Sequence, residues 1–414
     1  MNSWRQSRWV GTKNNWVRTE RLLVTVKTII KEVCMKQMEK HSLAQFVGGI
    51  FLILILLILT FTVASAASSP APVQKTISPP APTKLPKVIS ICSYSSGADG
   101  YIATSGIREA IEKLTPMKMR VEPYGTDPAR ILPVKLGQSE GALVTWGTGY
   151  PVSRGLFEFS KEEWGPQPLR LIWNVGAVTG GMGIRRDAGI KDWSDLKGKK
   201  VGFIPGGTAV NVQTEAWLAF AGLTWGDVKK IDFPSYSQGM KGLAEGAVDA
   251  VLMSAAAPAA YEAAASSYGL IRLNGDIKNV EGWKRAHKVM PWLLPIWTTG
   301  GPVYKDTPMW GGGYPYIFFT YPNVEADIVF EIVKAIHKGY DFTKDMHHLL
   351  KEGTIEFNLG PVGGKTPEEY IPFHEGAVKY FKSIGVWTKE LQEWQEKQIR
   401  EEKARMEGWK AKKK

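Results

Sequence analysis

The chain has 414 residues, of which 44% are hydrophobic and 22% are charged, and it carries a formal charge of +12. This length and composition are ordinary for a globular protein with a large core and exclude global disorder. The positive charge is concentrated at the ends, with nine basic against three acidic residues in 1–45 and nine against six in 388–414. Because no basic patch interleaved with stacking aromatic residues is visible, we expect no nucleic-acid partner.

An apolar run, FVGGIFLILILLILTFTV, covers residues 46–63, with Lys36 and Lys40 before it and Ala64-Ser65-Ala66 after it. A basic flank, an apolar run and a small-x-small site are typical of a signal peptide. A run of this length also just spans a bilayer, so cleavage after Ala66 and retention as an anchor both stay open, with cleavage favoured. Either outcome places the rest of the chain outside the cytoplasm, in the periplasm or an equivalent space.

The N-terminal part therefore divides into three expected segments. A basic region covers 1–45, within which Met35 or Met38 would give a more conventional start. The signal peptide or anchor covers 46–66. Residues 67–86 are rich in Pro, Ser and Ala without an apolar period, which predicts an extended linker.

The first folded unit alternates strands and helices. Strands are expected at 88–92, 119–121 and 141–145, and helices at 100–114 and 128–137. The loops after the strands are small and polar, reading Tyr94-Ser95-Ser96-Gly97 and Tyr124-Gly125-Thr126, and Trp146 follows the third strand. This is the βαβ rhythm of an open parallel sheet.

A second unit repeats the rhythm. Strands are expected at 201–204 and 248–253, and helices at 209–221 and 237–245, with the loop Gly206-Gly207-Thr208 after the first strand and Ser254 after the second. Residues 276–326 are interpreted as a return crossing with irregular loops. Helices follow at 326–340, within 367–386 and at 388–414, the last of which we expect to be a solvated helix rather than a partner-docking one.

Several stretches resemble the TAXI family of TRAP-transporter solute receptors. They are IRRDAGIKDWSDLKGKKVGF at 184–203, GLAEGAVDAVLMSAAAPAA at 242–260 and PEEYIPFHEGAVKYFKSIGVW at 367–387. The resemblance implies an α/β fold of the two-lobed type II periplasmic-binding-protein class, in which each lobe is an open mixed sheet flanked by helices and the ligand cleft lies between the lobes. It places lobe 1 at 87–178 and 277–387 and lobe 2 at 179–276, with the charged helix 388–414 outside both.

In such a fold the ligand lies at the carboxyl ends of the strands. We therefore expect ligand contacts from the loops named above, together with one aromatic residue and one serine. The set is Tyr94, Ser95, Ser96, Gly97, Tyr124, Gly125, Thr126, Trp146, Gly206, Gly207, Thr208 and Ser254. Free amides at a helix N-terminus suit a carboxylate. The structural alternatives are a plain tight turn at Gly206–Thr208, helix caps at Ser95 and Ser96, and a core position for Trp146.

No catalytic residue, metal site or cofactor is expected. The histidines show no HExxH pattern and no metal-like cluster, with His347 and His348 expected on an exposed helix face, and the sequence has no Walker A or GxSxG motif. The expected function is a non-enzymatic receptor that captures a small carboxylate-bearing solute by hinge closure and delivers it to the membrane subunits of a TRAP transporter. The alternatives are the binding protein of an ABC importer and a membrane-anchored ligand sensor. The loops depart from the family's usual residues, so the identity of the solute stays open.

Overall fold

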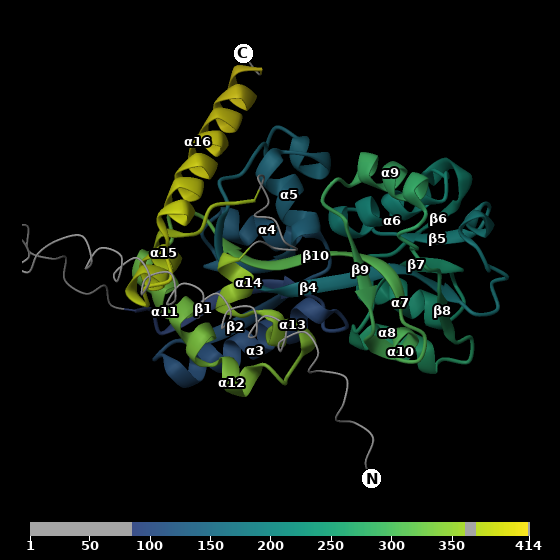
Figure 1. Ribbon diagram of the computed structural model, residues 1–414, viewed down its shortest axis with the longest axis horizontal. Helices are drawn as coiled ribbons and strands as arrows, with labels where there is room; N and C mark the ends of the chain where they lie inside the picture. The colour runs from purple at the N-terminus through teal and green to yellow at the C-terminus, as the bar shows by residue number, and fades with distance from the viewer. Residues whose placement is uncertain (1–84, 361–369, 413–414) are drawn as a thin grey trace, which may run out of the picture. The chain divides into compact units, whose positions relative to one another are not determined.

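A computed structural model describes residues 85–360 and 370–412 of the chain (Figure 1). The basic region 1–45, the export segment 46–66 and nearly all of the linker 67–86 lie outside the described residues. Within the described ranges, no helix combines the length and the apolar character that a membrane crossing requires.

The first half of the sheet is built from strands β1 (Val88–Tyr94), β2 (Lys118–Tyr124) and β3 (Gly141–Thr145), with β1 parallel to both neighbours. Helix α3 (Asp99–Leu114) connects β1 to β2, and helix α4 (Asp127–Lys135) connects β2 to β3. Ile89 and Ile91 of β1 are fully buried, as expected for a strand covered on its faces by helices.

The second half repeats this arrangement with strands β5 (Lys200–Phe203), β6 (Lys229–Asp232) and β7 (Ala250–Ser254), which run parallel. Helix α6 (Thr208–Phe220) follows β5, and helix α7 (Tyr236–Ala244) follows β6. We call β1–β3 with α3 and α4 the first half, and β5–β7 with α6 and α7 the second half.

Two long strands join the halves, β4 (Arg170–Arg185) and β10 (Met309–Thr320), which are antiparallel to each other (Figure 1). The strand order is β2-β1-β3-β10-β4-β7-β5-β6, while β8 (Leu270–Arg272) pairs with β4 and β9 (Leu294–Thr298) pairs with β10. The predicted fold class is therefore confirmed as a mixed α/β sheet flanked by helices. The expected lobe border at 178/179 falls inside β4.

For 276–326 we expected a return crossing with irregular loops. Strand β10 supplies the crossing, but the expectation of irregular loops is wrong. This region holds α9 (Val280–Val289), β9, α10 (Gly301–Tyr304) and the long strand β10. The start of β10 reads MWGGGYPY, which favours a loop by local propensity. Small residues are needed there because a Cβ at Gly312 would lie 2.9 Å from the Trp217 ring and 2.7 Å from Leu293. Close packing, rather than flexibility, explains the glycines.

The remaining helices pack on the sheet, several of them on its central strands, and on one another. They are α5 (Trp146–Arg154), α8 (Pro258–Ala265), α11 (Ala326–Lys338), α12 (Tyr340–Thr343), α13 (His348–Glu352), α14 (Ile355–Leu359), α15 (Glu375–Ser383) and α16 (Lys389–Ala411). Helix α16, drawn in yellow at the C-terminal end in Figure 1, has a charged surface but buries three polar residues: Gln395, Gln398 and Glu402. Glu402 forms an ion pair of 2.7 Å with Arg170 of β4, so this helix is not fully solvated and packs on its own chain.

Candidate functional site

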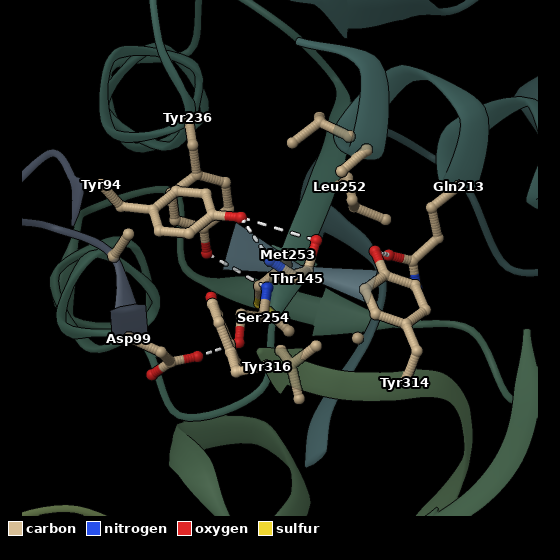
Figure 2. A pocket seen from close by; sticks show the side chains of 15 residues that line it. Tyr94, Asp99, Thr145, Gln213, Tyr236, Leu252, Met253, Ser254, Tyr314 and Tyr316 are labelled. Carbon is tan, nitrogen blue, oxygen red and sulfur yellow. Dashed lines mark hydrogen bonds between the residues drawn. The ribbon is translucent and has the colours of Figure 1, made fainter. Parts of the chain in front are cut away.

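A cavity lies where the two halves meet, at the carboxyl ends of strands from both (Figure 2). Tyr94, Thr145 and Ser254 are the last residues of β1, β3 and β7, and each lines it. The full lining is Tyr94, Ala98, Asp99, Thr145, Val178, Gly180, Ala209, Val210, Gln213, Tyr236, Leu252, Met253, Ser254, Tyr314 and Tyr316. The cavity is small. The volume open to the centres of water molecules is about 50 Å³, which is enough for a few waters or one small solute.

Four tyrosines contribute hydroxyl groups to the cavity. Tyr94 accepts a hydrogen bond of 2.9 Å from the Thr145 amide, and Tyr236 accepts one of 3.1 Å from the Ser254 amide (Figure 2). Tyr314 donates to Gln213 Oε1 at 2.6 Å. Burial raises the pKa of all four tyrosines, including Tyr316, so each stays a neutral donor and acceptor at physiological pH.

Asp99 is the one Asp, Glu, Lys, Arg or His among the residues that line the cavity. It begins helix α3 and is fully buried. Its Oδ2 accepts a hydrogen bond from the Ser254 hydroxyl of the second half, and its Oδ1 lies 3.1 Å from His347 Nε2. A buried carboxylate costs free energy unless hydrogen-bond donors or a bound partner compensate it.

Further hydrogen bonds join the halves around the cavity. The Ser95 and Ser237 hydroxyls are 2.9 Å apart, and the Ala209 amide donates to Asp127 Oδ2 at 3.0 Å. These contacts hold the first half against the second and require the two halves to be shut.

The N-terminus of α6 meets carboxylates of the protein itself. Asp127 Oδ2 accepts from the Ala209 amide, and the Thr208 hydroxyl donates to Glu158. Asp127 is 4% exposed; its Oδ1 forms an ion pair of 2.7 Å with Arg130 and accepts from Thr148 at 3.0 Å. This is the helix end at which the sequence predicted a solute carboxylate.

The structure places the predicted contact residues in three different settings. Tyr94 and Ser254 line the cavity. The next three residues, Ser95 to Gly97, lie at the edge of the cavity. The Ser95 hydroxyl contacts that of Ser237, and a Cβ at Gly97 would also meet Ser237. Ser96 is exposed. Trp146 is 4% exposed and packs on Tyr370 with ring centroids 4.4 Å apart, as the core alternative for this residue required.

The other predicted loops face each other across the halves instead of lining the cavity. The Asp127 amide donates to Gly206 O at 3.0 Å, a Cβ at Gly206 would touch Thr126, and Gly125 lies against Pro234. The Tyr124 hydroxyl donates to Glu122 at 3.3 Å, and Gly207 is the N-cap residue of α6, directly before the buried Thr208. The predicted loops thus come together, but around Asp127.

Sequence reasoning missed most of the cavity lining. Gln213 lies in the middle of α6, and Tyr236 begins α7. Tyr314 and Tyr316 are two residues apart on β10. The two-residue spacing of Tyr314 and Tyr316 is the one signal that marks a shared face. The Gly and Pro residues around these tyrosines favour a loop by local propensity and so mask that signal.

One cluster of described residues can hold a metal ion. Asp99, His347 and His348 each present a ligand atom, and these atoms lie within 4.8 Å of one another. The expectation of an exposed His347 is wrong, because its side chain is 11% exposed and faces Asp99.

Comparison with known proteins gives one family match and several weak structural likenesses. The sequence model of the NMT1-like family matches residues 101–385. A solved protein of Bordetella bronchiseptica RB50 is 15% identical, covering 72% of this chain and 89% of its own, with a TM-score of 0.44. An ancestral arginine-binding protein bound to arginine is 17% identical, covering 63% and 98%, with a TM-score of 0.40.

A third solved structure is an amino acid ABC transporter substrate-binding protein from Streptococcus pneumoniae bound to L-arginine. It is 11% identical, covering 64% of this chain and 93% of its own, with a TM-score of 0.39. At these identities and TM-scores, the ligands named for those proteins say nothing about the ligand of this chain.

Proposed function

We propose that this chain, which belongs to the NMT1-like family, is an extracytoplasmic solute-binding receptor that closes around a small polar molecule and delivers it to a membrane permease. The observation that carries the proposal is a cavity lined from both halves and shut by hydrogen bonds between them, among them Ser95 to Ser237 and Asp99 to Ser254. Ligands of open α/β sheets bind beyond the carboxyl ends of the strands, where this cavity lies. Contacts made only in the shut state allow a ligand to stabilise closure.

The cavity chemistry favours a neutral or cationic solute that donates hydrogen bonds. Its polar groups are tyrosine hydroxyls, the Gln213 amide, Thr145, Ser254 and the Asp99 carboxylate, and its lining residues include no Lys, Arg or His. A cationic group would compensate the buried charge of Asp99, whereas an anion would repel it.

A carboxylate-bearing solute is the second candidate, and one observation favours it. The N-terminus of α6 binds the Asp127 carboxylate in this structure, so the amides there are arranged for a carboxylate. A solute could use them only by displacing Asp127, and Arg130 would then have to pair with the newcomer.

The ligand carried through purification tests the solute class. Mass spectrometry of the denatured protein identifies it, and a thermal-shift series in EDTA with acetate, glycine, glycinamide and ethanolamine compares the charge types at similar size. We expect the ethanolamine or glycinamide ammonium group to raise the Tm and acetate to leave it unchanged. A rise with acetate alone would refute the cavity chemistry and support the second candidate.

Asp99→Asn is the matched variant for this experiment. Loss of a charged hydrogen bond of about 1.5–3 kcal/mol predicts affinity weaker by roughly ten- to a hundredfold. The control is Asp341→Asn, whose carboxylate pairs with Lys344 on an exposed helix face away from the cavity lining. Equal affinity of Asp99→Asn and Asp341→Asn for the solute would show that Asp99 does not contribute to solute binding.

The proposed transporter partner rests on the sequence resemblance alone. The closing block with Pro372, His374, Gly376 and Ala377 favours a TRAP-type secondary transporter over an ABC importer. Uptake of the identified solute by cells that express the chain with either type of membrane subunit distinguishes the two. A membrane-anchored ligand sensor would keep residues 46–66, so N-terminal sequencing of the mature protein tests that alternative.

A further inference from the structure

The side chains of Asp99, His347 and His348 bring three metal-ligating groups to one point. Asp99 opens helix α3, while His347 caps helix α13 and His348 begins it. Two imidazole nitrogens and one carboxylate oxygen form the protein ligand set of open zinc sites and of mononuclear iron(II) sites. The ligand atoms lie within 4.8 Å of one another.

The distances suit a single ion. Ligand atoms bound to one Zn²⁺ at about 2.0–2.2 Å lie roughly 3–3.5 Å from each other in a tetrahedral site. Asp99 Oδ1 and His347 Nε2 are already 3.1 Å apart. All ligand atoms lie within 4.8 Å of one another, so a shift of about an ångström would bring His348 into the range of a single ion.

Two of these ligand atoms are buried without a hydrogen-bond partner. They are Asp99 Oδ1 and His347 Nε2. The two atoms lie 3.1 Å apart, but their geometry does not make a hydrogen bond between them. An unsatisfied carboxylate oxygen on a fully buried residue is costly. A cation between the two atoms would satisfy both at once.

The surroundings support such an ion. The Ser254 hydroxyl donates to Asp99 Oδ2 and so fixes the carboxylate, in the way outer groups orient metal ligands. His347 Nδ1 accepts only a long contact of 3.4 Å from the Leu349 amide, which it would release when Nε2 binds the ion. An open pocket lined by His347, His348 and Glu352 gives the ion access from outside.

We propose that Asp99, His347 and His348 bind one divalent transition-metal ion, with Zn²⁺ as the probe, beside the cavity. Asp99 is shared with the proposed solute site, but His347 and His348 do not line the cavity, so the two histidine variants test the ion separately from the receptor function. Three protein ligands leave coordination positions open to water or to another donor.

Calorimetric titration of ZnCl₂ into the full-length chain tests the site. The protein is purified in mild detergent without a histidine tag, stripped with EDTA, exchanged into metal-free buffer and titrated with no solute added. We expect one Zn²⁺ per chain and at least tenfold weaker binding in His347→Gln and in His348→Gln. His287→Gln is the control, because His287 contacts Leu293 O and takes no part in the cluster.

Cobalt gives a second readout, since Co²⁺ bound by these ligands would show visible absorption that both variants lose. Zinc binding that is absent in the wild-type chain, unchanged in the two variants, or lost equally in His287→Gln would overturn the proposal. Asp99→Asn should also lose the ion; if it does not fold by circular dichroism, the two histidine variants decide alone. Solute binding measured in EDTA should stay intact in His347→Gln, which separates failure of this site from failure of the receptor.

Discussion

The Asp127 carboxylate connects both halves of the sheet, so its removal should weaken the whole fold. Asp127→Asn keeps the volume of the side chain but removes the charge that faces Arg130, whose side chain is 2% exposed. Breaking a buried ion pair from one side costs about 3–5 kcal/mol because the other charge stays uncompensated. Arg130 retains bonds to Ser93 O at 3.2 Å and Tyr124 O at 3.0 Å and its stacking on Tyr94, so we expect the lower end, about 3 kcal/mol.

Equilibrium urea denaturation followed by tryptophan fluorescence measures this loss in the free energy of unfolding. Asp341→Asn, which removes an exposed carboxylate, serves as the control and should leave the midpoint unchanged. The double variant Asp127→Asn/Arg130→Met should be more stable than the sum of the two single changes predicts. A loss below about 1 kcal/mol in Asp127→Asn, or strict additivity in the double variant, would refute this reading of the ion pair.

Two further predictions concern the C-terminal part. Gln395 of α16 accepts a hydrogen bond from the Phe373 amide at 2.8 Å and donates one to Phe373 O at 2.7 Å. Gln395→Ala should therefore lower the free energy of unfolding, measured by urea denaturation, by about 2 kcal/mol or more. Lys397→Ala, at an exposed position of the same helix, is the control and should change it little. Burial, with Arg170 nearby, lowers the pKa of His374 from 6.5 to about 4, so the folded state favours the neutral form and stability falls as the pH drops from 6.5 towards 4. Between pH 7 and pH 5 the loss in the free energy of unfolding amounts to roughly 2 kcal/mol. His374→Asn should abolish this loss while keeping the cap on the Gly376 amide. An equal pH dependence of stability in the variant and the wild-type protein would show that His374 is not its source.

The alternation of strands and helices could be predicted from the sequence because it depends on neighbours along the chain. The buried strand β5 was expected at 201–204 and spans Lys200–Phe203, and the turn after it has Gly206 at a φ of 78°. Such features depend on side-chain period and on backbone conformations that only glycine adopts easily. They determine the fold class and the carboxyl-end loops.

The tertiary structure alone decided which side chains form the cavity and which ligate one another. Asp99 meets Ser254 and His347, and Tyr314 meets Gln213, although each pair is far apart along the chain. Local period carries no information about such pairs, because they arise when β4 and β10 bring the two halves together. For the same reason Gly206–Thr208, expected to bind a solute carboxylate, instead lies beside Asp127, a partner that only the closure of the two halves supplies.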